Sequence, residues 1–178
     1  MEIRTFLAED NITGNRTVDQ LISSEYFDIN NDELLEKNSK ILTTDNIIYI
    51  SGYIEIDYFG QVFMGKKYWD YVIWLWMNIV EGIGSFIYKN TDAEILFPDQ
   101  HLFIIIRPNK DYVLVEIKEP VKSHQRAMYP KREFSESLVN ACLRIFTTIS
   151  KYKQTKAVSE KLEICKAYRA YLDGSVSL

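Results

Sequence analysis

The sequence contains few of the residues from which catalytic and cofactor motifs are built. Its 7 glycines never cluster, which excludes the glycine-rich loops that hold nucleotide phosphates. The residue spacings of zinc and calcium sites are missing, as is the Gly-x-Ser-x-Gly turn of serine hydrolases. We therefore expect a protein without a bound metal or cofactor.

The chain also lacks a long hydrophobic run. The longest, residues 71–77, is far shorter than the roughly 20 apolar residues that a membrane-spanning helix needs. The first residues do not have the basic and then apolar character of a secretory signal. The two cysteines, Cys142 and Cys165, lie on apolar stripes of predicted helices, where a free thiol packs as a small hydrophobic group. These features predict a cytosolic protein with two reduced thiols in its core.

Only two histidines are present, His101 and His124. A histidine pair can supply the general acid and base of a hydrolase or nuclease. Glu55 and Asp57 form a second candidate pair, because residues two apart on a strand point to the same side. An enzyme of this kind requires the histidines and carboxylates to meet around one pocket. Each group also has an ordinary explanation as a loop residue or as part of a solvated strand face.

The hydrophobic pattern predicts one α+β domain over residues 1–178, with an antiparallel sheet packed against a long central helix and two C-terminal helices. Apolar residues alternate over 46–59, as in a half-buried strand, and recur at three- and four-residue steps over 66–88, as in a helix. Gly52 is interpreted as a bulge, Gly82 and Gly84 as close-packing positions, and 119–129 as a loop. The other predicted elements are strands 2–8, 93–97, 102–106 and 112–117, helices 17–27 and 156–172, a helix capped by Asn30 or Asn31 and ending at Lys37, and a helix beginning at Pro130.

Charge is divided unevenly along the chain. Residues 1–60 contain twelve acidic and four basic side chains, a net charge of −8, whereas residues 61–178 carry +4. Acidic charge steers a basic protein toward a surface, and aromatic side chains supply contacts that exclude water. The alternative interpretation is an ordinary solvated acidic surface. The candidate partner-binding residues are Tyr26, Asp28, Asp32, Glu33, Glu36, Tyr53, Glu55 and Asp57.

Basic residues gather in the segment 118–132. Such clusters contact phosphates in nucleic-acid-binding proteins, but a domain with a net charge of −4 is a poor nucleic-acid binder. The segment can equally pair with the protein's own acidic surface, or with a second copy in a homodimer. Its basic residues are Lys118, Lys122, His124, Arg126, Lys131 and Arg132.

Part of the sequence resembles small bacterial immunity proteins of toxin–antitoxin and contact-dependent growth inhibition systems. The resemblance covers residues 45–120 and rests on Trp69 and Trp76, the segment Phe97-Pro98-Asp99-Gln100, the strand 102–106 with Arg107, and the strand 112–117. These are packing motifs, so no functional residue is carried over. The resemblance implies an inhibitor that binds one cognate toxin, often a nuclease with a basic active site. An acidic, aromatic surface would suit such a partner by imitating nucleic acid or by covering the catalytic groove.

Overall fold

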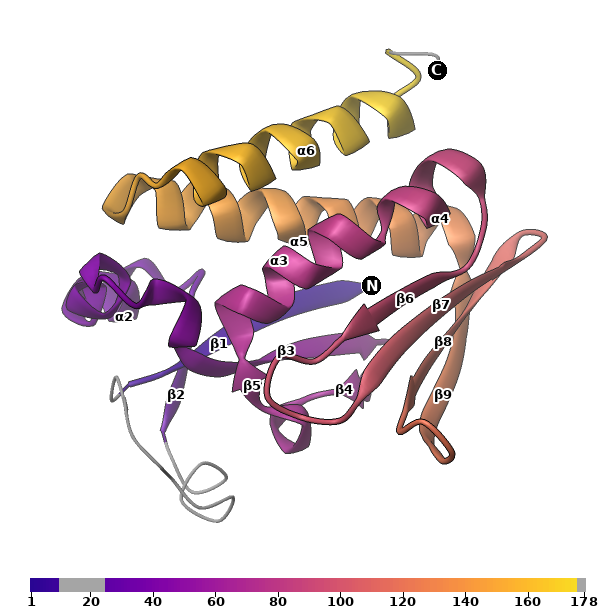
Figure 1. Ribbon diagram of the computed structural model, residues 1–178, viewed down its shortest axis with the longest axis horizontal. Coiled ribbons are helices and arrows are strands. Elements are labelled where there is room, and N and C mark those ends of the chain that lie inside the picture. The colour runs from indigo at the N-terminus through magenta and orange to yellow at the C-terminus, as the bar shows by residue number, and fades with distance from the viewer. Residues whose placement is uncertain (10–24, 176–178) are drawn as a thin grey trace.

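The computed structural model describes residues 1–9 and 25–175, which form two antiparallel sheets with the longer helices gathered on one side of them (Figure 1). The first sheet has the strand order β2-β1-β3-β4, and a short β5 also pairs with β3. The second has the order β6-β7-β8-β9. The α+β class is confirmed, although the strands form two sheets where one was expected. The strands are β1 (Glu2–Ala8), β2 (Tyr26–Asp28), β3 (Ser51–Tyr58), β4 (Gln61–Met64), β5 (Asp70–Tyr71), β6 (Ala93–Leu96), β7 (Phe103–Asn109), β8 (Tyr112–Lys118) and β9 (Ser123–Pro130).

The helices follow local sequence signals closely. The side chain of Asn31 accepts a hydrogen bond from Leu34 N and caps the first short helix, and Thr155 caps the last helix in the same way. Both boundaries agree with the prediction. The α-helices are α2 (Asp32–Lys37), α3 (Val72–Gly82), α4 (Gly84–Lys89), α5 (Lys131–Tyr152) and α6 (Lys156–Leu172), and single 3-10 turns are η1 (Ser39–Thr43), η2 (Ile47–Tyr49) and η3 (Lys66–Tyr68).

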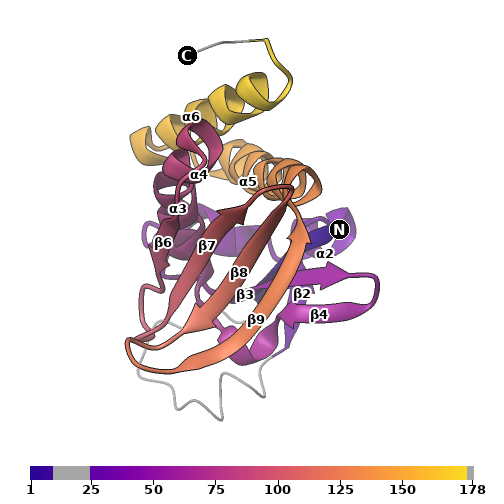
Figure 2. The ribbon, with the colours of Figure 1, turned by 90° about the vertical axis from the view of Figure 1, so that its right-hand side faces the viewer.

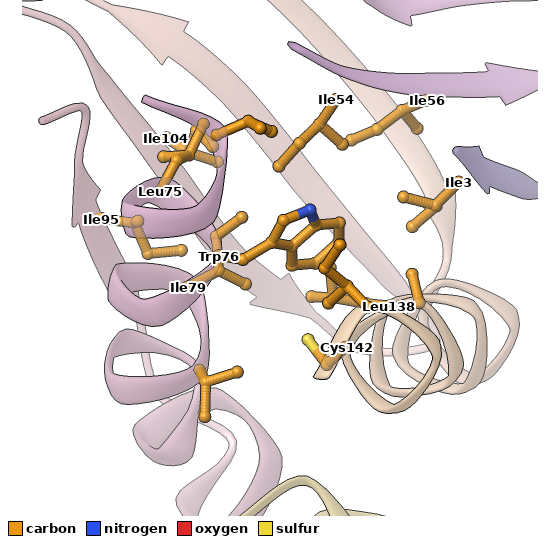
Figure 3. Packing of buried hydrophobic residues seen from close by; sticks show 14 of the residues in the cluster. Ile3, Ile54, Ile56, Leu75, Trp76, Ile79, Ile95, Ile104, Leu138 and Cys142 are labelled. Carbon is orange, nitrogen blue, oxygen red and sulfur yellow. The ribbon is translucent and has the colours of Figure 1, made fainter. Parts of the chain in front are cut away.

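The two sheets share one hydrophobic core. Trp76 of α3 is fully buried at its centre, and its Nε1 donates a hydrogen bond of 3.0 Å to Thr5 Oγ1 on β1. Figure 3 shows its indole ring among isoleucines of both sheets and Leu138 of α5. Because one side chain touches both sheets and a C-terminal helix, the sheets belong to one packed unit.

The prediction of one long helix over 66–88 is wrong at its start, and the structure has two helices, α3 and α4, in its place. Residues 66–71 form the turn η3 and the strand β5, and the helix begins at Val72. Asp70 explains this start, because its buried carboxylate accepts a bond of 2.6 Å from Tyr71 N and ties β5 in place. Gly82 is the last residue of α3. A Cβ atom at this position would lie 2.7 Å from the Ile95 side chain, which confirms the predicted role of Gly82 in close packing.

Three further predictions differ from the structure. The strand expected over 46–59 begins only at Ser51, because residues 47–49 form a 3-10 turn. Gly52 is not a bulge: its register is regular, and a Cβ there would lie 2.2 Å from the carbonyl oxygen of Phe6. Residues 123–129, expected as part of a loop, form the edge strand β9 together with Pro130, and the helix expected from Pro130 begins at Lys131. The predicted helix 17–27 falls mostly outside the described residues, and its last two positions belong to β2.

Candidate functional site

The outer face of the first sheet collects five of the eight predicted partner-binding residues. Strand pairing places Arg4 opposite Glu55, Phe6 opposite Tyr53, and Glu2 opposite Asp57. The short strand β2 adds Asp28 beside Phe6 and Tyr26 beside Ala8. We call this surface the first-sheet face, and define it by Glu2, Arg4, Phe6, Tyr26, Asp28, Tyr53, Glu55 and Asp57.

Three aromatic rings form the middle of the first-sheet face. Phe6 stacks on Tyr53 with ring centroids 4.6 Å apart, and Tyr26 meets Tyr53 edge-on at 5.1 Å. Tyr53 is only 9% exposed, and burial, followed by the nearby Glu55 carboxylate, raises its pKa to about 12. Tyr53 therefore supports the cluster from beneath, while the half-buried Phe6 and Tyr26 present their rings to solvent.

Two cations lie among the acidic groups of this face. Arg4 donates through Nη2 to Glu55 Oε1 and extends over the Phe6 ring, with its guanidinium carbon 5.7 Å from the ring centroid. The hydrogen bond to Glu55 raises the pKa of Arg4. Lys66 places its ammonium 4.9 Å from the centroid of Tyr26. Glu55 is therefore engaged with Arg4, and Asp28 and Asp57 keep most of the available negative charge.

The remaining three predicted residues lie on α2, next to this face. Asp32, Glu33 and Glu36 are exposed, and α2 contacts β2. The turn into α2 is held by Asp28, whose Oδ1 accepts bonds of 2.9 Å from Asn30 N and 2.8 Å from Asn30 Nδ2. Phe27, in contrast, is buried in the core and points away from the acidic residues around it.

The basic segment 118–132 is mostly ordered as β9, on the second sheet. Arg126 of β9 and Arg107 of β7 both donate to Glu116 of β8, at 2.9 and 3.0 Å. Burial alone would raise the pKa of Glu116, but hydrogen bonds from Ser123, Arg126 and Arg107 hold it below its ordinary value. Arg126 therefore pairs within its own sheet, and not with the acidic residues of the first sheet.

The two histidines meet at one cavity. His101 comes from the turn between β6 and β7, His124 from the start of β9, and both line a space of about 700 Å³. Glu55 and Asp57, which the enzyme hypothesis placed beside them, do not: Glu55 pairs with Arg4, and Asp57 accepts a bond of 2.7 Å from Gly60 N. That predicted four-residue site is wrong, because Glu55 and Asp57 belong to the outer face of β3.

A different carboxylate accompanies the histidines. Glu119 Oε1 lies 2.8 Å from His124 Nε2, and Lys67 lines the same cavity. Glu119 and Lys67 were not predicted as site residues, because 119–129 was expected to be a loop and 66–71 part of a helix. Glu119 and His124 come together because 123–130 is a strand that pairs with β8. The signal for this strand is an alternation of exposed and less exposed positions over 123–129. Most side chains at these positions are polar, so hydrophobicity does not reveal the alternation.

The cysteines are both fully buried and free, Cys142 on α5 and Cys165 on α6. Burial, together with a hydrogen bond to Cys165, raises the pKa of the Cys142 thiol well above its ordinary value. Their predicted place in the core is confirmed.

Neither a metal cluster nor a membrane-spanning helix is found in the part of the chain that the structure describes. Within residues 1–9 and 25–175, no three His, Cys, Asp or Glu side chains come together in a way that could hold a metal ion. Over the same residues, no helix is both long enough and apolar enough to span a bilayer.

No protein-family model, curated protein or solved structure matches the chain.

Proposed function

We propose that the protein is a non-catalytic binding protein, and specifically an immunity protein that binds and neutralises a basic bacterial toxin domain. One observation supports this most: residues as far apart in sequence as Glu2 and Asp57 form one acidic surface around a cluster of aromatic rings. Their convergence gives a basic partner both long-range attraction and a central apolar contact. The sequence resemblance to immunity proteins provides the class of partner.

The acidic helix α2 extends the surface. Asp32, Glu33 and Glu36 are exposed, and none of them forms an ion pair with another described residue. Exposed acids without partners contribute to association mainly by accelerating encounter, and their effect weakens as salt rises. A toxin whose active site is basic, such as a nuclease, would be attracted and covered by the same charges.

The test is a salt-dependent capture experiment with matched variants. The tagged protein is incubated with native lysate at low and high salt, and bound proteins are identified by mass spectrometry. We expect one stoichiometric basic protein that is released as salt rises and is lost in the triple reversal D32K/E33K/E36K. Triple reversal at exposed acids elsewhere, E94K/E160K/E163K, makes the same change in net charge and should retain the partner. Equal capture by both triple variants would contradict the proposal.

The competing function is a small hydrolase or nuclease, and one observation favours it: His101 and His124 line the same cavity. With Glu55 and Asp57 elsewhere, the acid–base work would fall to the two histidines, with Glu119 positioning His124. Purified protein should then cleave RNA or a model phosphodiester, and His101→Ala and His124→Ala should each abolish that cleavage. Absence of any cleavage would remove this alternative.

A further inference from the structure

Three distant segments build the cavity that contains the two histidines. Its wall is formed by η3 with Lys67 and Tyr68, by the turn 99–102 that leads into β7, and by the β8–β9 hairpin. Figure 2 places the β6–β7 and β8–β9 turns at the same end of the second sheet. The cavity therefore lies where this end of the second sheet meets the first.

Each segment is fixed to its neighbour by a polar contact. Asp70 accepts a bond of 3.1 Å from Asp99 N, and Gln100 Nε2 donates to the carbonyl oxygen of Trp69, which attaches the turn 99–102 to the first sheet. On the other side, Tyr68 donates from its hydroxyl to Gln125 Oε1 at 3.2 Å. Because these contacts fix the backbone of the three segments, the wall loses little conformational entropy when a ligand binds.

The donors that face this cavity are those that suit an oxyanion. Lys67, His101 and His124 all line it, and an ammonium and two imidazoles can each donate a hydrogen bond to a phosphate oxygen. Glu119 Oε1 lies 2.8 Å from His124 Nε2 and accepts its proton, so Nδ1 is the nitrogen left for a ligand, and it donates to a phosphate oxygen when the ring is in the imidazolium form. Asp99 is the second carboxylate on the wall, and its amide, bonded to Asp70, holds the turn.

The remainder of the wall is less polar. Leu102 is buried, and Tyr68 and Pro120 add further apolar surface. A cavity of about 700 Å³ accommodates a ligand much larger than a free phosphate ion, within the range of about 300–1,000 Å³ found for small-molecule sites.

From this arrangement we infer that the cavity is a binding site for a phosphate ester of about nucleotide size. Lys67, His101 and His124 contact the phosphate, and Leu102 and Pro120 pack against the rest of the ligand. The site is separate from the first-sheet face, and its occupancy does not depend on whether the protein binds a basic partner or cleaves a phosphodiester.

The test is a ligand titration followed by NMR of the imidazole protons. Because the chain has only two histidines, each of them is resolved and reports on its own turn. Adenosine 5′-monophosphate, inorganic phosphate and adenosine are added separately at constant pH and ionic strength. We expect adenosine monophosphate to shift both histidines, with about tenfold or greater preference over inorganic phosphate, and adenosine to shift neither.

Matched lysine variants show whether the shift comes from the cavity. Lys67→Gln should weaken binding by about fivefold or more. Lys110→Gln removes the same charge from the exposed turn between β7 and β8 and should leave affinity unchanged.

Three results would overturn the inference. These are the absence of any shift at either histidine, movement of one histidine alone, and equal loss of affinity in the two lysine variants. None of them bears on the capture experiment, which uses a different surface, so the two proposals fail independently.

Discussion

The outer faces of the two sheets carry their charge in different ways. On the first sheet, acids surround three stacked or edge-on aromatic rings, and Arg4 pairs with Glu55 and, at 3.8 Å, with the exposed Glu2. On the second sheet, Glu116 is 2% exposed and is held between two arginines on the neighbouring strands. In Figure 2, none of the described helices covers this second face. The first face leaves negative charge available for a partner, whereas the second neutralises its most buried charge internally.

This difference explains the charge asymmetry of the sequence. The acidic first third forms β1, β2, α2 and β3, and the basic segment near residue 125 becomes β9 at an edge of the other sheet. Charged side chains on an open edge strand also discourage pairing with another chain. Much of the acidic charge of residues 1–60 therefore lies on the first-sheet face and α2, whereas the basic charge of the later residues is spread over β9, α5 and α6.

The largest expected effect is on the core that joins the two sheets. Trp76→Ala should lower the free energy of unfolding by about 4 kcal/mol, because it removes a fully buried indole and its bond to Thr5. The half-buried Trp74 is the control, and its alanine variant should cost about 1–2 kcal/mol. Urea unfolding followed by circular dichroism measures both. Separate transitions for the two sheets in the wild-type protein would contradict the shared core.

The next effect concerns the buried Asp70, which attaches the cavity turn to the first sheet. Burial raises its pKa from 3.8 to about 6 against the opposing bonds from the amides of Tyr71 and Asp99. Since the folded pKa is raised, the stability contributed by Asp70 is fully present below pH 3.8 and is lost as pH rises through about 6.

An asparagine variant isolates this contribution. Asp70→Asn keeps an oxygen acceptor but cannot ionise. Between pH 4 and pH 7 the free energy of unfolding of the wild-type protein should therefore fall by up to about 3 kcal/mol relative to that of the variant. Urea unfolding at several pH values measures the difference, and parallel profiles would show that Asp70 does not titrate in this range.

A smaller effect compares the paired glutamates of the two faces. Glu116→Gln weakens bonds from two arginines at a buried position and should cost about 2 kcal/mol. Glu55→Gln affects a single, more exposed pair with Arg4 and should cost about 1 kcal/mol or less. Thermal unfolding of the two variants side by side tests the order. A larger loss at Glu55 would mean that the first face, too, depends on internal pairing.

Local signals predicted much of this fold. The cap at Asn31, the start of the last helix at Lys156 and the apolar stripes of α5 and α6 depend on neighbours within a few residues, so they could be predicted from the sequence. β9 was missed because its outward side chains are polar and its pairing partner is β8. The early part of the long helix was mispredicted because the carboxylate of Asp70 forms bonds that periodicity does not encode.

The candidate sites were predictable to different extents. Alternation along β3 indicated that Tyr53, Glu55 and Asp57 share a side, but Phe6 and Arg4 join them only through the register between β1 and β3. The shared cavity of the histidines depends on three segments that meet in the tertiary structure. The positions of His101, His124, Glu55 and Asp57 in the sequence do not indicate that the two histidines share a cavity without the two carboxylates.

The most direct test of the central claim is the affinity of the captured partner for two doubly neutralised variants. D28N/D57N removes two charges from the first-sheet face while keeping the oxygen atoms that accept bonds from Asn30 and Gly60. E94Q/D111N removes two charges from the second sheet and its β7–β8 turn. Measured by calorimetry at low salt, D28N/D57N should weaken binding by about tenfold or more, and E94Q/D111N by less than about twofold. Equal affinities, or a greater loss in E94Q/D111N, would contradict the assignment of the first-sheet face as the binding surface.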